Sequence, residues 1–189
     1  MDKITLEAVK NWVENFVIDY QLCPFARKVY LQNRIRFLVE NSADTTEMMT
    51  TFVNEMAFLK QISSENTDTT ILIFPNGLDD FNNFLDFVAM AQHFLEELGH
   101  EEDLQIATFH PAYQFEETLT TSAENYTNRA HYQILHVVRE KSMANVLENY
   151  ENPDLIPIKN IALMNKIGAE QLEKMLKNRV WTKKDDNIK

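Results

Sequence analysis

Apolar residues recur at three- and four-residue steps over the first twenty positions, which is the pattern of an amphipathic helix with one buried face. The members of this stripe are Leu6, Val9, Val13, Phe16, Val17 and Tyr20. Thr5 is suited to cap the helix, and Pro24 disfavours helical backbone at Cys23, so we expect the helix to end near Leu22. Pro24 is also suited to the first turn of a second helix, which would have Cys23 at its N-cap.

Three later segments have the pattern of β-strands, and helical stripes separate them. The strand segments are residues 34–40 (RIRFLVE), 69–74 (TTILIF) and 104–109 (LQIATF). The first helical stripe follows a capping residue, Asp44, and the second begins at Asp79 and ends at a C-capping Gly99. Strands and helices therefore alternate through the first half of the chain.

Residues 132–138 (YQILHVV) are predicted to form a fourth strand, for which an antiparallel edge position is one option, and the rest is helical around Pro157 and after Gly168. This order predicts an α/β (or α+β) fold with a mainly parallel central sheet of about four strands, covered by helices, and with further helices at the C-terminus. We expect a single domain over residues 1–189 that ends in a solvated tail at residues 182–189.

The segment at residues 110–133 has little helical or strand pattern. A loop of this length in a compact domain is uncommon and is usually functional or disordered. Its aromatic content argues against disorder. Ligands in parallel sheets bind beyond the carboxyl ends of the strands, and this loop follows the third strand, so it leaves the sheet where a site is expected.

Charge and cysteine content narrow the classes of partner. A net charge of −11 opposes nonspecific binding to nucleic acid and to anionic membranes. The N-terminal segment MDKITLEAVKNW is neither a secretory signal nor a membrane span. The single cysteine, Cys23, excludes an internal disulfide and fits a reducing compartment. We expect a cytoplasmic protein without a nucleic-acid or membrane partner, and the sequence leaves its oligomeric state open.

Cys23 is the first candidate for chemistry. A thiol at a helix N-terminus is favoured as the thiolate, so we expect Cys23 to titrate below the ordinary value of about 8.5. Together with a histidine, such a cysteine forms a nucleophile–base pair, and His110, directly after the third strand, is the candidate base. The alternative is an inert cysteine that packs as a small hydrophobe beside Leu22 and Phe25.

Three of the five histidines, His110, His131 and His136, raise the possibility of a zinc site that Cys23 or Glu140 would complete. Their spacing matches no zinc motif, and paired cysteines are absent from the sequence. His136 has a second interpretation as a packed, hydrogen-bonded histidine of the core. We therefore assign neither a metal nor a cofactor.

Arg129 and Arg139 are the candidates for binding a small anionic molecule, because guanidinium groups bind carboxylate and phosphate in bidentate fashion. Asn125, Asn128 and His136 are further candidate ligand-binding residues with neutral hydrogen-bonding groups. The alternative is that these polar side chains pin the long loop to the domain. If Arg129 lines a ligand site, its removal should leave the stability nearly unchanged.

Four short motifs, LCPFA, FHPAYQF, NYTNRAHY and ILHVVRE, follow one another in this order. Together they resemble the bacterial family catalogued as domain-of-unknown-function family 1415, over most of the chain. The resemblance implies no established activity. Where the family pattern runs Asn-Arg-Ser-Pro-Tyr-Pro, residues 128–133 read Asn-Arg-Ala-His-Tyr-Gln, which argues against a family-wide role for His131. The matching positions are Cys23, Pro24, Phe25, His110, Pro111, Tyr113, Asn125, Asn128, Arg129, His136, Arg139 and Glu140.

Two classes of function remain. The first is a small enzyme or binder with a polar Cys/His/Arg site for an anionic ligand, and whether it is an enzyme is undecided. The second is a noncatalytic structural or protein-interaction domain whose motif residues pin the long loop. Contact between Cys23 and His110 beside an open pocket would favour the first class, and their separation would favour the second.

Overall fold

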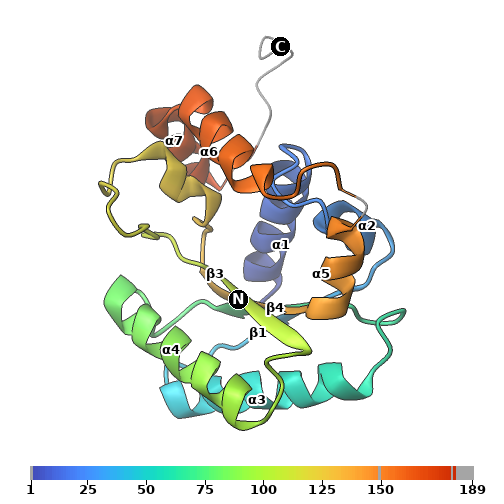
Figure 1. Cartoon of the computed structure of the whole chain (residues 1–189). Coiled ribbons are helices and arrows are strands. Elements are labelled where there is room, and N and C mark those ends of the chain that lie inside the picture. Colours follow the sequence, from blue (N-terminus) through green and yellow to red (C-terminus); the bar gives the residue numbers. More distant parts are fainter. Residues whose placement is uncertain (1, 149, 180, 182–189) are drawn as a thin grey trace.

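A four-stranded sheet lies at the centre of the computed structural model, which describes residues 2–148, 150–179 and 181 (Figure 1). The strands are β1 (Ile35–Val39), β2 (Thr69–Phe74), β3 (Leu104–Phe109) and β4 (Gln133–Arg139). Their spatial order is β1-β2-β4-β3. β1 pairs with β2 in parallel, whereas β4 pairs antiparallel with both β2 and β3. The tail predicted at residues 182–189 lies outside the described residues.

The sheet is thus mixed, and the prediction of a mainly parallel sheet was wrong in this respect. β4 is antiparallel, but it lies inside the sheet, and the edge strands are β1 and β3. Five of the seven residues of β4 are buried, whereas in β3 only Leu104 is buried. The interior place of β4 agrees with its apolar residues Ile134, Leu135, Val137 and Val138, which alternate between both faces of the sheet.

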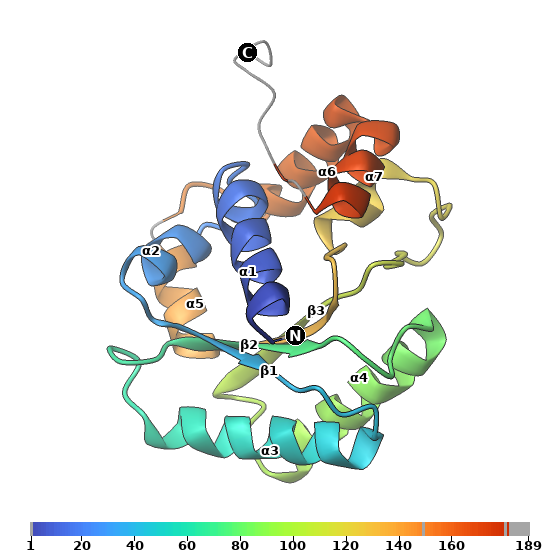
Figure 2. The same cartoon turned by 180° about the vertical axis from the view of Figure 1, so that it is seen from behind.

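Two helical layers cover the sheet (Figures 1 and 2). The layer on one face consists of α3 (Thr45–Gln61) and α4 (Phe81–Glu97). The layer on the other face consists of α1 (Asp2–Trp12), the π-helix η1 (Val13–Ile18), α2 (Ala26–Leu31) and α5 (Glu140–Leu147). On the same side but farther from the sheet, α6 (Leu155–Ile167) and α7 (Ala169–Asn178) pack against the long loop. The long loop contains one 3-10 turn, η2 (Ala123–Thr127). No described helix is both long and apolar enough to cross a lipid bilayer.

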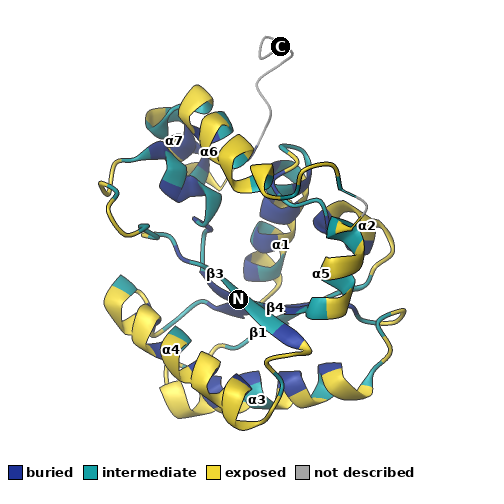
Figure 3. Ribbon diagram, in the orientation of Figure 1, coloured by how far each residue is buried: buried dark blue, intermediate teal, exposed yellow. Residues whose placement is uncertain are grey.

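The core has two parts, one on each face of the sheet, because the side chains of β2 alternate between the faces. The helices α3 and α4 are largely exposed on their outer surface (Figure 3). Ile71 and Ile73 pack against the layer that contains α1, and Leu72 and Phe74 pack against α3 and α4. All four side chains are at most 3% exposed. Burial of each such side chain stabilises the fold by about 1.5–3 kcal/mol. Because β2 buries side chains on both faces, it stabilises the packing of both helical layers against the sheet.

The helix boundaries follow the predicted caps only in part. Asp44 caps α3, as predicted, by accepting hydrogen bonds from the backbone N–H groups of Thr46 and Glu47 at 2.8 and 3.1 Å. The first helix begins at Asp2 instead of after Thr5, and from Val13 it continues as η1. π-Helical segments are rare and occur frequently at functional sites.

Gly77, in the turn after β2, is the glycine that the fold needs most. Its φ is +84°, and a Cβ there would lie 2.9 Å from the backbone of Ala43. We expect Gly77→Ala to lose about 1–2 kcal/mol of stability from the left-handed backbone and about 1–3 kcal/mol more from displaced neighbours. Gly99→Ala is the matched control, because Gly99 has a φ of +66° and no atom within 4 Å. Equal losses in urea denaturation of the two variants would contradict the close approach at Gly77.

Candidate functional site

Asn125 holds the long loop together from inside. Its side chain is fully buried, and its Oδ1 accepts hydrogen bonds from the backbone N–H of Phe115 at 3.0 Å and the hydroxyl of Thr118 at 2.9 Å. Its Nδ2 donates to the backbone oxygen of Leu119 at 2.8 Å. These bonds occupy both ends of the carboxamide, so Asn125 shapes the loop from within.

Arg129 has the same role. The side chain is 8% exposed, and its Nε and Nη2 donate to the backbone oxygens of Tyr113 and Thr120 at 3.0 and 2.8 Å. The guanidinium also lies over the ring of Tyr126, 4.5 Å from its centroid. Arg129 therefore joins distant parts of the loop, as in the structural alternative considered from the sequence.

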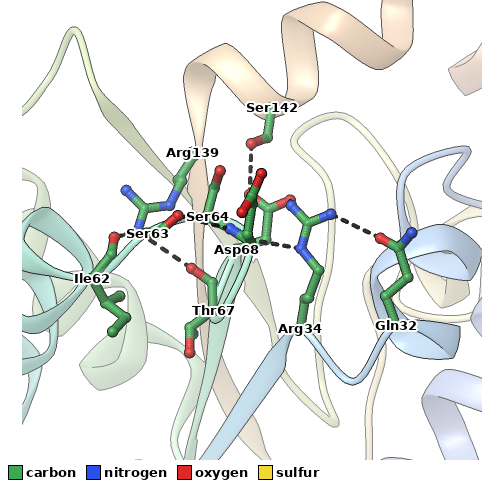
Figure 4. A network of polar contacts seen from close by, with 10 residues as sticks. Gln32, Arg34, Ile62, Ser63, Ser64, Thr67, Asp68, Arg139 and Ser142 are labelled. Carbon is green, nitrogen blue, oxygen red and sulfur yellow. Dashed lines mark hydrogen bonds and ion pairs between the residues drawn. The ribbon is translucent and has the colours of Figure 1, made fainter.

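Arg139 is the last residue of β4, at the end of the strand opposite to the long loop, and it lies close to Ile62 and Thr67 (Figure 4). Its Nη2 donates to the backbone oxygens of Leu59, Ile62 and Thr67, so it caps the C-terminus of α3. Beside it, Asp68 accepts hydrogen bonds from Arg34 and from Ser142 of α5. The two predicted anion-binding arginines thus occupy separate places, and each binds backbone carbonyls.

His110 is a structural histidine. It is 1% exposed, and its ring packs against Phe81 and Phe84 of α4 with centroid distances of 5.2 and 5.0 Å. Its Nδ1 accepts a hydrogen bond from the backbone N–H of Ala112, and its Nε2 donates to the backbone oxygen of Leu78, both at 3.0 Å. Burial lowers the pKa of His110, so the ring is neutral and both nitrogens are occupied.

The sheet separates Cys23 from His110. Phe109, the last residue of β3, packs against Trp12 of α1 with ring centroids 4.9 Å apart, so the next residue, His110, points towards α4 on the opposite face. Cys23 packs on the face that carries α1. The predicted pairing of Cys23 with His110 is therefore not formed.

Cys23 instead lies where two cavities meet. An open cleft of about 520 Å³ is bordered by η1, α6 and the long loop, including Asn128. A smaller, more enclosed chamber of about 140 Å³ lies between the sheet and the helices α1, η1 and α2. Val17, Cys23 and Phe109 line both. The cleft and the chamber therefore adjoin, and Cys23 is one of the residues where they meet.

Asn128 forms part of the wall of this cleft. Its Nδ2 donates to the backbone oxygen of Thr108 at 3.1 Å, and its Oδ1 accepts a hydrogen bond from the hydroxyl of Thr127 at 3.1 Å. Asn128 thus connects the loop to β3 and brings the loop to the mouth of the cleft.

His136 faces the chamber from the middle of the central strand β4. Its Nε2 lies 2.7 Å from the hydroxyl of Thr69, and that hydroxyl donates its own proton to the backbone oxygen of Val137 at 2.6 Å. Nε2 must therefore be the donor towards Thr69. Desolvation lowers the pKa of His136 to about 4, so the ring is neutral and Nδ1 carries a lone pair.

Two further residues that line the chamber have polar side-chain groups that form no hydrogen bond with the described residues. Trp12 is 2% exposed, and its Nε1–H has no hydrogen-bond partner. Gln105 on β3 lines the chamber, and its carboxamide forms no hydrogen bond with the described part of the chain. Trp12, Gln105 and His136 thus bring three neutral polar groups to the lining of a mostly apolar chamber, which also includes Thr69 and Cys23.

The thiol of Cys23 is shifted in the opposite direction to the one predicted. Hydrogen bonding from the backbone N–H groups of Phe25 and Ala26, at the start of α2, acts to lower the pKa of the thiol, as expected near a helix N-terminus. Burial outweighs these bonds and raises the pKa of the Cys23 thiol above its ordinary value. The thiol is therefore protonated at neutral pH.

The histidines of the metal hypothesis are dispersed. His110 and His136 lie on opposite faces of the sheet, and His131 accepts a hydrogen bond from Nε1 of Trp181 at 2.6 Å. Among the described residues, no group of three or more His, Cys, Asp or Glu side chains is arranged to hold a metal ion.

A family model described as a protein of unknown function, DUF1415, matches residues 4–174. The chain therefore belongs to the DUF1415 family. No curated protein and no solved structure matched the chain. The DUF1415 match begins in α1 and ends in α7, so it includes the sheet, the long loop and all the elements that border the cleft and the chamber.

Sequence reasoning missed part of the site in this DUF1415 protein. Trp12 lies beside the apolar stripe of the first helix and resembles an ordinary core residue, and nothing in the sequence indicated η1. Gln105 did carry a signal, because it is a long polar side chain in a mostly apolar strand segment. Gln105 lies on the same face of the sheet as His136 because of the register of β3 with β4, which the sequence does not show.

We expect Arg129→Ala to destabilise the protein, contrary to the expectation for a ligand-site arginine. Removal of the guanidinium leaves the backbone oxygens of Tyr113 and Thr120 without their donors, at a cost of about 1–3 kcal/mol for each one that stays dry. Arg27→Ala is the control, because Arg27 is exposed and should change stability by less than about 0.5 kcal/mol. Similar urea midpoints for the two variants would contradict the structural role of Arg129.

We also expect the neutral His136 to make stability depend on pH. Its folded pKa of about 4 lies below the ordinary value of about 6.5, so between these values the unfolded chain binds a proton that the folded chain does not. The stability from this group is present above about pH 6.5 and falls by at most about 3 kcal/mol as the pH approaches 4. The free energy of unfolding of His136→Gln should therefore fall less steeply over this range. His93→Gln, at an exposed position, should keep the wild-type slope, and identical slopes for all three proteins would refute the assignment.

Proposed function

We propose that this member of the DUF1415 family binds a small, mostly apolar molecule that extends from the open cleft past Cys23 into the chamber. The observation that carries the proposal is that the two cavities share the lining residues Val17, Cys23 and Phe109, so that Cys23 would stand at the passage between them. Ligand sites in proteins are typically concave, about 300–1,000 Å³ in volume, and apolar with a few placed polar groups. The cleft alone falls in that range, and the chamber supplies the polar groups.

The charge of the lining favours a neutral ligand. None of the described residues that line the cleft or the chamber is a lysine or an arginine, and Glu124 is the one charged residue among them. Arg129 and Arg139, the predicted anion-binding residues, are bound to backbone carbonyls. The proposal therefore replaces the anionic ligand expected from the sequence with a neutral one.

An enzymatic version of the proposal uses different partners from those expected. Cys23 would be the nucleophile, and Nδ1 of His136 would accept its proton, because Cys23 and His136 line the same chamber. His110 is unsuited to this role because both of its ring nitrogens are bonded to the backbone. A protein that binds the ligand without catalysing a reaction needs only the cavity and not the pair of Cys23 and His136.

The noncatalytic alternative also has a specific observation in its favour. The polar atoms of Asn125 are bonded to the loop itself, and Arg129 joins parts of the same loop. Pinning of the loop and binding of a ligand are compatible, however, because the pinned loop borders the cleft. The two functions differ in whether a small molecule enters the cavity.

Access of small molecules to the passage can be measured by protection of Cys23 from alkylation. We expect neutral probes such as cyclohexanol and benzyl alcohol to slow the reaction of Cys23 with N-ethylmaleimide in a saturable manner. Ile161→Arg should weaken this protection, because Ile161 lines the cleft, whereas Ile158→Arg on the same helix should not. If no neutral probe slows the reaction, or if both variants behave alike, the proposed binding site is wrong.

The pH dependence of the same reaction tests the state of the thiol. Because burial raises the pKa of Cys23, we expect the midpoint of the alkylation rate to lie above that of the urea-unfolded chain. His136→Gln should lower the rate near neutral pH if Nδ1 accepts the thiol proton, and should leave it unchanged if Cys23 only lines the passage. A midpoint below that of the unfolded chain would show an activated thiolate and contradict the effect of burial.

A further inference from the structure

We infer that the chamber selects a neutral head group that carries both a hydrogen-bond donor and an acceptor, of the hydroxyl or carboxamide class. This inference rests on the proposed function, because it concerns the end of the ligand that passes Cys23. It follows from the polar atoms of the chamber, from the protonation state of each, and from the lack of charge among its described lining residues.

Trp12 supplies a donor without an acceptor. Its side chain is 2% exposed and lines the chamber, and its Nε1–H has no partner among the described residues. Its aromatic neighbour is Phe109, with ring centroids 4.9 Å apart, and a ring face is only a weak acceptor. Buried donors without a partner are rare in folded proteins, so an acceptor atom of a bound molecule is the fitting partner.

His136 supplies an acceptor without a donor. The hydroxyl of Thr69 gives its proton to the backbone oxygen of Val137, which fixes the ring proton of His136 on Nε2. Nδ1 of the neutral ring is then an acceptor that bonds none of the described residues. A ligand that satisfies both Trp12 and His136 needs an acceptor atom and a donor hydrogen.

Gln105 lies on the same face of the sheet as His136. In the register of β3 with β4, Ala107 is opposite His136 and Gln105 is opposite Val138, so Gln105 and His136 are diagonal neighbours. The carboxamide of Gln105 offers a donor and an acceptor together. The small side chain of Ala107 between them leaves room above the sheet at this point.

The chamber disfavours ionised head groups. None of its described lining residues is Asp, Glu, Lys or Arg, and its histidine is neutral. A carboxylate or an ammonium group would lose its hydration there without gaining an opposite charge. Water can fill such a polar space in the free protein, and a head group with a donor and an acceptor can take over its hydrogen bonds.

The size of each cavity divides the ligand into two parts. The chamber, at about 140 Å³, suits a head group, and the cleft, at about 520 Å³, suits a larger apolar body. Probes with one body and different head groups therefore isolate the chamber. A suitable series is cyclohexylmethanol, cyclohexanecarboxamide, cyclohexanecarboxylate and cyclohexylmethylammonium, with methylcyclohexane as the probe without a head group.

The two indole N–H signals in a ¹⁵N–¹H spectrum report directly on the head group. We expect the alcohol and the carboxamide to shift the Nε1–H signal of Trp12 and not that of Trp181, which is already bonded to His131. Both should bind about tenfold more tightly than methylcyclohexane, and the two charged probes should bind more weakly than either. Trp12→Phe should remove most of this preference, because it deletes the indole N–H and keeps an aromatic ring in the lining.

The outcomes separate the two proposals. If all neutral probes bind equally and the Trp12 signal stays in place, the cavity binds apolar molecules but the head-group inference is wrong. If the carboxylate or the ammonium probe binds most tightly, the inference is also wrong. If no probe binds, the proposed function fails, and the inference fails with it. The measurements on the wild-type protein decide these cases even if Trp12→Phe does not fold.

Discussion

The insertion of β4 between β2 and β3 is the constraint on which the rest of the structure depends. Because β3 and β4 are antiparallel neighbours, Phe109 at the end of β3 is paired with Ile134 at the start of β4. The long loop therefore leaves the sheet and returns to it at the same place. A loop of this kind must satisfy its own backbone groups, and Asn125 and Arg129 do so with side-chain hydrogen bonds.

The same insertion creates the interior site. A strand in the middle of a sheet is covered on both faces, so a polar residue that it carries must find a partner or face a cavity. His136 does both, because its Nε2 bonds Thr69 on β2 and the residue opposite it on β3 is the small Ala107. The widened turn of η1 and the ring of Trp12 close the chamber from the other side.

The sequence predicted local features well and contacts between distant segments poorly. Periodicity located the helices and strands, and the capping role of Asp44 followed from short-range chemistry. The antiparallel position of β4 inside the sheet depends on long-range pairing, which no local pattern encodes. For the same reason, the sequence showed that Cys23 precedes a helix but not that it is buried, and it placed His110 after a strand without showing which face it points to. Arg129 was interpreted as a ligand group because the direction of the loop carbonyls is invisible in the sequence.

The central place of β4 also has a consequence for folding. β1 and β2 can pair early, since only α3 separates them in the chain, but β2 pairs with β4 on its other side, and β4 comes after α4, β3 and the long loop. Until β4 docks, one edge of the apolar run TTILIF has no hydrogen-bonding neighbour, and such edges promote association between chains. Closure of the sheet by contacts so distant in sequence is intrinsically slow. β4, which carries His136 of the candidate site, is therefore also the strand whose docking covers the exposed edge of β2 and prevents association between chains.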